Sequence, residues 1–115
     1  MTVFLKGSIF PATGDWTAWI LVDGESACSL HCDGGKVRVL WCISDPARRE
    51  AASAWLTTRA REVWSRSRDT SFLGSMEAAA RLAVPEILWA NLEARHGRAV
   101  RALRTAMDTA GARRG

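Results

Sequence analysis

Hydrophobic and polar residues alternate along the first third of the chain in a pattern that predicts β-strands. The apolar positions there are filled largely by branched and aromatic side chains, which favour extended backbone. Clusters of glycine, aspartate and proline separate the segments. The expected strands are 2–10, 17–22, 25–32 and 36–43. Together they predict an antiparallel β-meander of three to four strands over residues 1–44.

Two tight turns set the expected pairing of these strands. Asp23-Gly24 and Asp33-Gly34-Gly35 supply the positive φ angles that short hairpin turns need. Because side chains alternate along a strand, uninterrupted pairing divides them between two faces. The face expected to form the core carries Trp19, Leu21, Cys28, Leu30, Cys32, Val37, Val39, Trp41 and Ile43. The opposite, mixed face is expected to carry Ala18, Ile20, Val22, Ser29, His31, Arg38, Leu40 and Cys42.

The pattern changes to helical spacing after residue 44. Ser44-Asp45 followed by Pro46 is a start signal for a helix, which we expect to run from 46 to about 66. Its apolar stripe is Ala52, Leu56, Ala60 and Val63. This stripe should cover the core face of the sheet.

Two further helices are expected beyond a loop at 69–74. A short helix should begin after Ser75 and end near Ala83, because the residue before a proline disfavours helical backbone. Pro85 should then start the last helix. Gly97 either lies inside that helix, at a cost of about 1 kcal/mol relative to alanine, or caps it and splits it. The predicted fold is α+β, with three helices packed on one sheet face in a single domain, 1–110, and a disordered tail, 111–115.

Composition agrees with one globular domain. The chain has 115 residues, of which 48% are hydrophobic and 24% charged. No apolar run approaches the roughly 20 residues of a membrane-spanning helix. The first residues lack the basic-then-apolar order of a signal peptide. We therefore expect a cytoplasmic protein, with no membrane partner and with its three cysteines as free thiols.

The spacing of the cysteines and histidines argues against a zinc site or a catalytic motif. Cys28, His31, Cys32 and Cys42 invite a metal site, but Cys28 and Cys32 lie about 13 Å apart along one strand. His31 should also point away from both, so four ligands cannot converge on a zinc ion. His31 and His96 have no acid–base partner pattern, and the sequence has no nucleophile or phosphate-binding motif. We expect no catalytic residues, no metal and no cofactor.

One stretch, 77–92, resembles a helix-turn-helix. The similarity rests on Glu77-Ala78-Ala79, Leu82, Val84, Trp89 and Leu92. Ala83 stands where the family usually has glycine at the turn, and Glu86 and Glu93 would lie on a helix that should attract phosphate. The resemblance implies an alternative function, a DNA-binding regulator using residues 77–96. The competing interpretation is a pair of alanine-rich helices that cover the sheet.

Charge and tryptophan content suggest where a partner would bind. The net charge is +4, and 13 of the 16 basic residues, all arginines, follow residue 44. Arginine and tryptophan are typical of interface hot spots, although arginines can also simply cover tryptophan rings. The expected partner-binding residues are Arg48, Trp55, Arg59, Arg66, Arg98, Arg101 and Arg104.

The expected function is that of a small, non-enzymatic binding protein. Its Arg- and Trp-bearing helices would engage an acidic protein surface or a nucleic-acid-handling complex, with nucleic acid itself as a further partner class. An accessory or inhibitor protein encoded by a phage or plasmid, a mobile genetic element, fits these traits.

Overall fold

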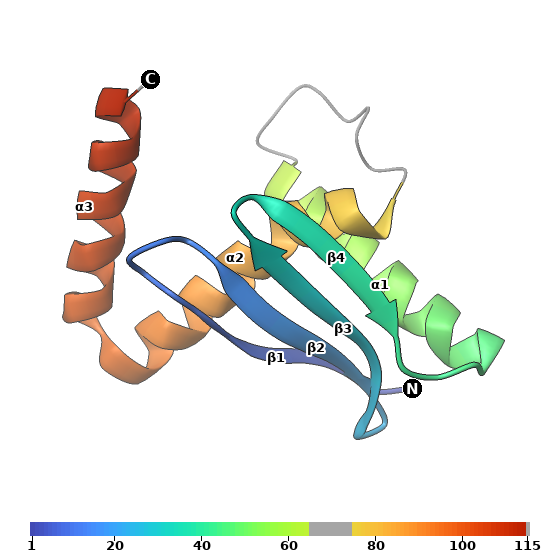
Figure 1. Ribbon diagram of the computed structural model, residues 1–115. Helices are drawn as coiled ribbons and strands as arrows, with labels where there is room; N and C mark the ends of the chain where they lie inside the picture. The colour runs from blue at the N-terminus through green and yellow to red at the C-terminus, as the bar shows by residue number, and fades with distance from the viewer. Residues whose placement is uncertain (65–74, 115) are drawn as a thin grey trace.

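The computed structural model describes residues 1–64 and 75–114 and confirms the predicted α+β class (Figure 1). Four strands form one antiparallel sheet in the order β1-β2-β3-β4. Three helices follow the sheet in the chain. The elements are β1 (Val3–Ile9), β2 (Trp16–Val22), β3 (Glu25–Asp33), β4 (Lys36–Trp41), α1 (Pro46–Trp64), α2 (Met76–His96) and α3 (Arg98–Arg114). The expected loop at 69–74 lies outside the described residues.

Both hairpin turns form as predicted. Asp23 and Gly24 have φ angles of 51° and 84°, and Gly34 and Gly35 have φ angles of 59° and 81°. Positive φ at both central residues is the backbone of a type I′ turn, whose twist matches that of the flanking strands. These turns fix where β2 meets β3 and where β3 meets β4.

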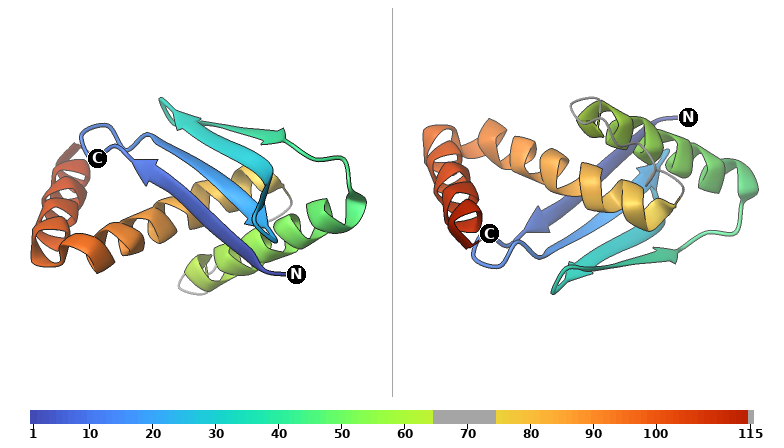
Figure 2. Two further views of the ribbon diagram at one scale, coloured as in Figure 1. Left: turned by 90° about the horizontal axis from the view of Figure 1, so that it is seen from below. Right: turned by 90° about the horizontal axis from the view of Figure 1, so that it is seen from above.

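The helices α1 and α2 lie side by side across one face of the sheet (Figure 2). Ala52, Leu56 and Ala60 of α1 are fully buried, which confirms most of the predicted stripe. On α2, small residues dominate the buried face, so the two helices can approach each other and the sheet closely. The buried residues of α2 are Ala79, Ala80, Ala83, Val84, Leu88 and Trp89.

The face of β2 was predicted wrongly, because β3 contains a bulge. Ile20 lies opposite Cys28 while Leu21 lies opposite Ser26, so Ala27 is an extra residue in β3. One inserted residue reverses the facing of everything beyond it on the paired strand. The core therefore receives Ile20 and the rest of the buried β2 set, Trp16, Ala18 and Val22, in place of Trp19 and Leu21. The predicted faces of β3 and β4 are correct, with Leu30 fully buried and Val39 packed against the core.

The break predicted at Pro85 is absent, and α2 is one continuous helix from Met76 to His96. Proline inside a helix removes one backbone hydrogen bond, at a cost of about 3 kcal/mol. Burial of Ala83, Val84 and Leu88 around it offsets that cost. The helix-turn-helix interpretation of 77–96 is corrected by the same observation, because both of its helices would lie in α2. Ser75 caps α2 as predicted, accepting a hydrogen bond from the Ala78 N–H at 3.1 Å.

Gly97 splits the last helical segment, which decides between the two alternatives. Its φ is 61°, and its N–H donates to the Glu93 carbonyl at 2.9 Å. The chain changes direction after α2, and α3 stands at one end of the molecule (Figure 1). The α3 helix packs against α2, with Val100 buried. It continues to Arg114 and so includes most of the segment predicted as a tail.

Candidate binding surfaces

The predicted partner-binding residues of α1 that the structure describes make contacts within the fold. Arg48 donates a hydrogen bond to Glu25 at the start of β3, and its Nε lies 3.6 Å from Asp45. These contacts tie the beginning of α1 to the sheet. Arg48 therefore stabilises the fold, and a charge reversal there would remove the ion pair that joins α1 to β3.

Trp55 and Arg59 form a pair on the same helix. The Arg59 guanidinium lies 5.8 Å from the centre of the Trp55 ring, and Arg59 also pairs with Glu62 at 3.1 Å. Both Trp55 and Arg59 are only half-buried. Arg66 lies outside the described residues, so the structure describes Arg48, Trp55 and Arg59 of the arc expected on α1.

Arginine covers tryptophan at two other places in the fold. Arg49 lies 5.3 Å from the Trp41 ring and donates to the Ile43 carbonyl at 2.6 Å. Arg104 lies 5.8 Å from the Trp89 ring. Each pair gains cation–π attraction and covers an apolar ring. Much of the arginine and tryptophan enrichment is thus explained by packing.

On α3 the predicted arginines divide into two kinds. Arg104 hydrogen-bonds Glu86 of α2 at 2.6 Å, and this bond raises the pKa of its guanidinium. Arg98 and Arg101 are exposed, and neither forms an ion pair within residues 1–64 and 75–114. Figures 1 and 2 place α3 and the start of α1 at different ends of the molecule. The structure therefore does not gather the predicted residues into one surface.

In the part of the chain that the structure describes, no helix lies over the face of the sheet opposite α1 and α2 (Figure 2). Its side chains come from alternate positions of every strand, and the strand register aligns them in rows. One row is Lys6, Trp19, Ser29 and Leu40, and the next is Ser8, Thr17, His31 and Arg38. We call this set, with Phe4 and Leu21, the open sheet face.

Large apolar side chains stand exposed on the open sheet face. Trp19 is 36% exposed, Phe4 45% and Leu40 59%. Phe10 borders a shallow hollow of about 770 Å³ on the same face, which is also lined by His31, Lys36, Arg38 and Leu40. Sequence reasoning missed Trp19 because the bulge at Ala27 was not expected, and nothing in the sequence marks that bulge.

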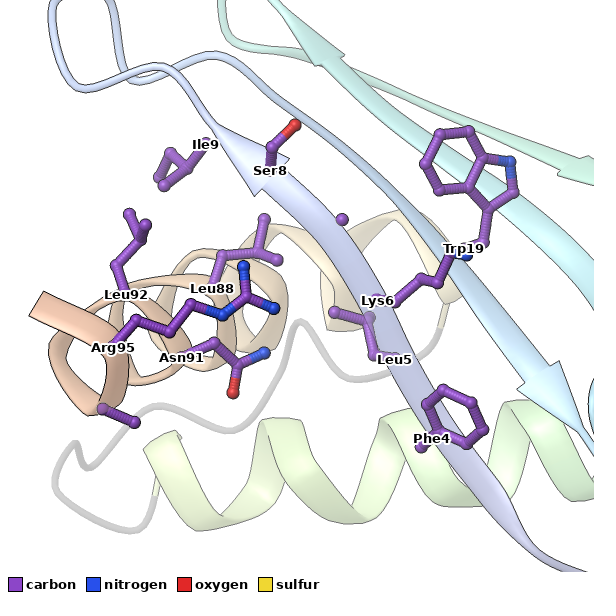
Figure 3. Close-up of a pocket in the computed structure, with 12 residues that line it drawn as sticks. Phe4, Leu5, Lys6, Ser8, Ile9, Trp19, Leu88, Asn91, Leu92 and Arg95 are labelled. Carbon is purple, nitrogen blue, oxygen red and sulfur yellow. The ribbon is translucent and has the colours of Figure 1, made fainter.

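A second concave region lies where β1, at the edge of the sheet, passes the second half of α2 (Figure 3). It has a volume of about 750 Å³. We call it the edge groove. Its lining comes from β1, from one residue of β2 and from α2, namely Phe4, Leu5, Lys6, Gly7, Ser8, Ile9, Trp19, Leu88, Asn91, Leu92, Ala94 and Arg95.

The cysteines and acids of the described residues offer no metal site. No group of three or more histidine, cysteine, aspartate or glutamate side chains lies close enough there to hold a metal ion. Cys28, Cys32 and Cys42 are free thiols. Burial raises the pKa of Cys28 to about 12, with a smaller contribution from Cys42, so Cys28 stays protonated and unreactive near neutral pH.

Comparison with known proteins adds no functional assignment. No family model matches the sequence, and no curated protein or solved structure matches it either. In the part of the chain that the structure describes, none of the helices has the length and apolar character needed to cross a membrane.

Proposed function

We propose that this protein is a non-catalytic binding protein and that the open sheet face is its principal contact surface for a macromolecular partner. The observation that carries the proposal is the exposure of Trp19 near the middle of a sheet face that none of the described helices covers. Tryptophan and arginine dominate the energetics of protein interfaces. A large aromatic ring left in water on a flat surface is a feature that a partner would cover.

Charge on this face indicates the kind of partner. Lys6 lies beside Trp19 in the strand register, and Arg38 lies in the neighbouring row. Lys36 adds a third positive charge at the hollow, against Asp15 and Asp33. The partner we propose is accordingly a protein surface that carries acidic groups, or a protein within a nucleic-acid-handling complex. The exposed arginines Arg98 and Arg101 on α3 are a separate, smaller cationic surface.

Capture from a lysate of the source cells, with and without nuclease, tests this proposal. Trp19→Ser and Arg38→Glu should each reduce the recovered partner about tenfold or more, the scale of a hot-spot loss. Arg61→Glu is the matched control, because Arg61 is an exposed arginine of α1, and α1 lies on the other face of the sheet. Equal losses for Arg38→Glu and Arg61→Glu, or no loss for either sheet variant, would remove the open sheet face from consideration.

Single-stranded nucleic acid is a second candidate ligand of the same face. Exposed aromatic rings on an open antiparallel sheet can stack on unpaired bases while basic side chains contact phosphates. Phe4 and Trp19 with Lys6 and Arg38 provide both kinds of group. Binding of a mixed-sequence oligonucleotide that weakens steeply with salt and is lost in Trp19→Ser would favour this candidate. If nuclease treatment leaves the capture of the partner unchanged, a protein partner is favoured over nucleic acid.

A further inference from the structure

The backbone of β1 leaves a row of hydrogen-bonding groups unpaired by the sheet. The Asp23 N–H donates to the Thr2 carbonyl at 2.8 Å, and the Phe10 N–H donates to the Asp15 carbonyl at 2.8 Å. In an antiparallel pair, bonded and non-bonded residue pairs alternate. The register between these two bonds is unbroken, so the even-numbered residues of β1 bond to β2. The odd-numbered residues therefore direct their N–H and C=O groups away from β2, and they are Val3, Leu5, Gly7 and Ile9.

The α2 helix forms the far wall of the edge groove beside this row. Leu88, Asn91, Leu92 and Arg95 follow helical spacing, so they share one side of α2. Figure 3 shows the Asn91 and Arg95 side chains projecting from α2 toward β1, and Leu88 and Leu92 between them and the strand end. An edge strand with a helix alongside is the arrangement that accepts an extended peptide as an added strand.

The described charged residues of the edge groove are of one sign. Among residues 1–64 and 75–114, its lining includes Lys6 and Arg95 and no acidic residue. Neither cation forms an ion pair within residues 1–64 and 75–114. An occupant that carries acidic side chains would neutralise both.

A second copy of this chain does not suit the groove. Antiparallel pairing of β1 with β1 of another copy about its centre would bring Lys6 close to its own counterpart, because Lys6 lies near the middle of the strand. Like charges placed directly opposite each other on neighbouring strands are destabilising. Each copy also carries a net charge of +4. Charge complementarity thus selects an acidic polypeptide over self-association.

We propose that the edge groove binds an extended acidic segment of a partner polypeptide, which adds to the sheet beside β1. Backbone groups of Leu5, Gly7 and Ile9 hydrogen-bond the segment, and Asn91 offers a side-chain amide to its main chain. Acidic side chains on one side of the segment reach Lys6, and apolar side chains on the other side contact Leu88 and Leu92. Arg95 receives an acidic residue at the end of the groove. The inference rests on the proposed function and specifies the kind of partner and its mode of binding.

Selection from a displayed library of random peptides as long as β1, seven residues, tests the inference on the full chain. The enriched peptides should alternate acidic and apolar residues. Their binding should shift the backbone amide NMR signals of β1 and of the second half of α2. N-methylation removes the N–H donor, and alternate nitrogens of an extended peptide face the same side. Methylation of the nitrogens that face β1 should abolish binding. Methylation of the nitrogens that face away from β1 should have little effect.

Charge reversal in the groove supplies the second arm of the experiment. Lys6→Glu and Arg95→Glu should each raise Kd about tenfold or more, and Arg101→Glu on α3 is the matched control. Melting temperatures establish that each variant is folded. Enrichment of peptides without acids, binding that N-methylation leaves unchanged, or equal effects of Arg95→Glu and Arg101→Glu would overturn the inference.

Other occupants give distinct results. A concentration-dependent dimer that Lys6→Glu alters would assign the groove to a second copy and overturn the inference. An oligonucleotide that shifts the same amides, with no peptide enriched, would assign it to nucleic acid and also overturn it. Arg38 and Arg95 separate the two proposals, because Arg38 does not line the edge groove and Arg95 is not part of the open sheet face. If Arg38→Glu loses the captured partner while Arg95→Glu leaves capture and peptide binding unchanged, the groove inference fails and the proposed function stands. If Arg38→Glu leaves capture unchanged while acidic peptides still bind the groove, the assignment to the open sheet face fails and the groove inference stands.

Discussion

Arg104 of α3 donates a hydrogen bond of 2.6 Å to Glu86 of α2, and the two residues lie on either side of the break at Gly97. The chain turns at Gly97, so that α3 stands away from the sheet. Among the described elements, α3 makes its main contacts with α2, and these contacts hold its position. The guanidinium also lies over the ring of Trp89, which is a buried residue of the core. Arg104 thus has a structural role in joining α3 to α2, which the sequence alone did not indicate.

Removing this pair should loosen α3 without unfolding the domain. Glu86→Gln and Arg104→Gln, with the double variant, should show a coupling free energy of about 1 kcal/mol or less, since both side chains are partly exposed to solvent. Hydrogen exchange of α3 amides should accelerate, while exchange in the sheet stays slow. Arg101→Gln is the matched control and should change neither quantity. Unchanged exchange in α3 for Arg104→Gln would show that Val100 and its neighbours alone hold the helix.

Because of the bulge at Ala27, substitutions at two adjacent residues of β2 should differ strongly in their effect on stability. Ile20→Ala should lower the free energy of unfolding by about 2–5 kcal/mol, because Ile20 is fully buried. Trp19→Ala should cost much less, since its side chain lies on the open sheet face. Leu30→Ala should match Ile20→Ala, because Leu30 is equally buried on β3. Chemical denaturation of the three variants measures this, and a larger loss for Trp19→Ala than for Ile20→Ala would contradict the observed pairing.

Gly7 is required where β1 approaches β2. A Cβ atom at this position would lie 2.2 Å from the Thr17 carbonyl oxygen and 2.7 Å from the Ala18 Cα, distances at which the backbone must move. Gly7→Ala should therefore destabilise the fold by about 1–3 kcal/mol, the usual cost of overpacking. Ser8→Ala, at an exposed neighbouring position, should stay within about 0.5 kcal/mol of the parent. Thermal melting of the two variants distinguishes a tight strand pairing from a general sensitivity of β1.

Buried Cys28 should make stability fall in alkaline solution. Its pKa is raised to about 12 in the folded protein, above its ordinary value of 9.0. Between these values the unfolded chain loses a proton that the folded chain keeps, so the free energy of unfolding decreases as the pH rises from about 9 toward 12. Below pH 9 the thiol is protonated in both states and contributes no pH dependence.

Comparing Cys28→Ala with Cys42→Ser isolates that effect. The first variant should lose part of the alkaline decrease, although it also leaves a small cavity, and the exposed Cys42 variant should keep it. Thiol labelling of the folded protein should modify Cys42 first and Cys28 only on unfolding. Rapid labelling of Cys28 under native conditions would place it outside the core.

The sequence by itself determined the features that depend on neighbouring residues. Glycine and aspartate at two turns specified the hairpins, Ser75 specified a helix start, and the spacing of Ala52, Leu56 and Ala60 specified the face of α1. Each of these follows from local backbone geometry or from a period along the chain. They were sufficient to predict the meander followed by helices.

Only the tertiary structure decided what depends on contacts between distant segments. Pairing against β2 placed the bulge at Ala27 and turned Trp19 to the open sheet face, and packing on the sheet carried α2 through Pro85 despite the lost hydrogen bond. Arg48 pairs with Glu25 and Arg104 pairs with Glu86, and in each pair the acid belongs to an element distant in the sequence. The edge groove likewise exists because α2 passes the free edge of β1, residues that lie far apart in the chain.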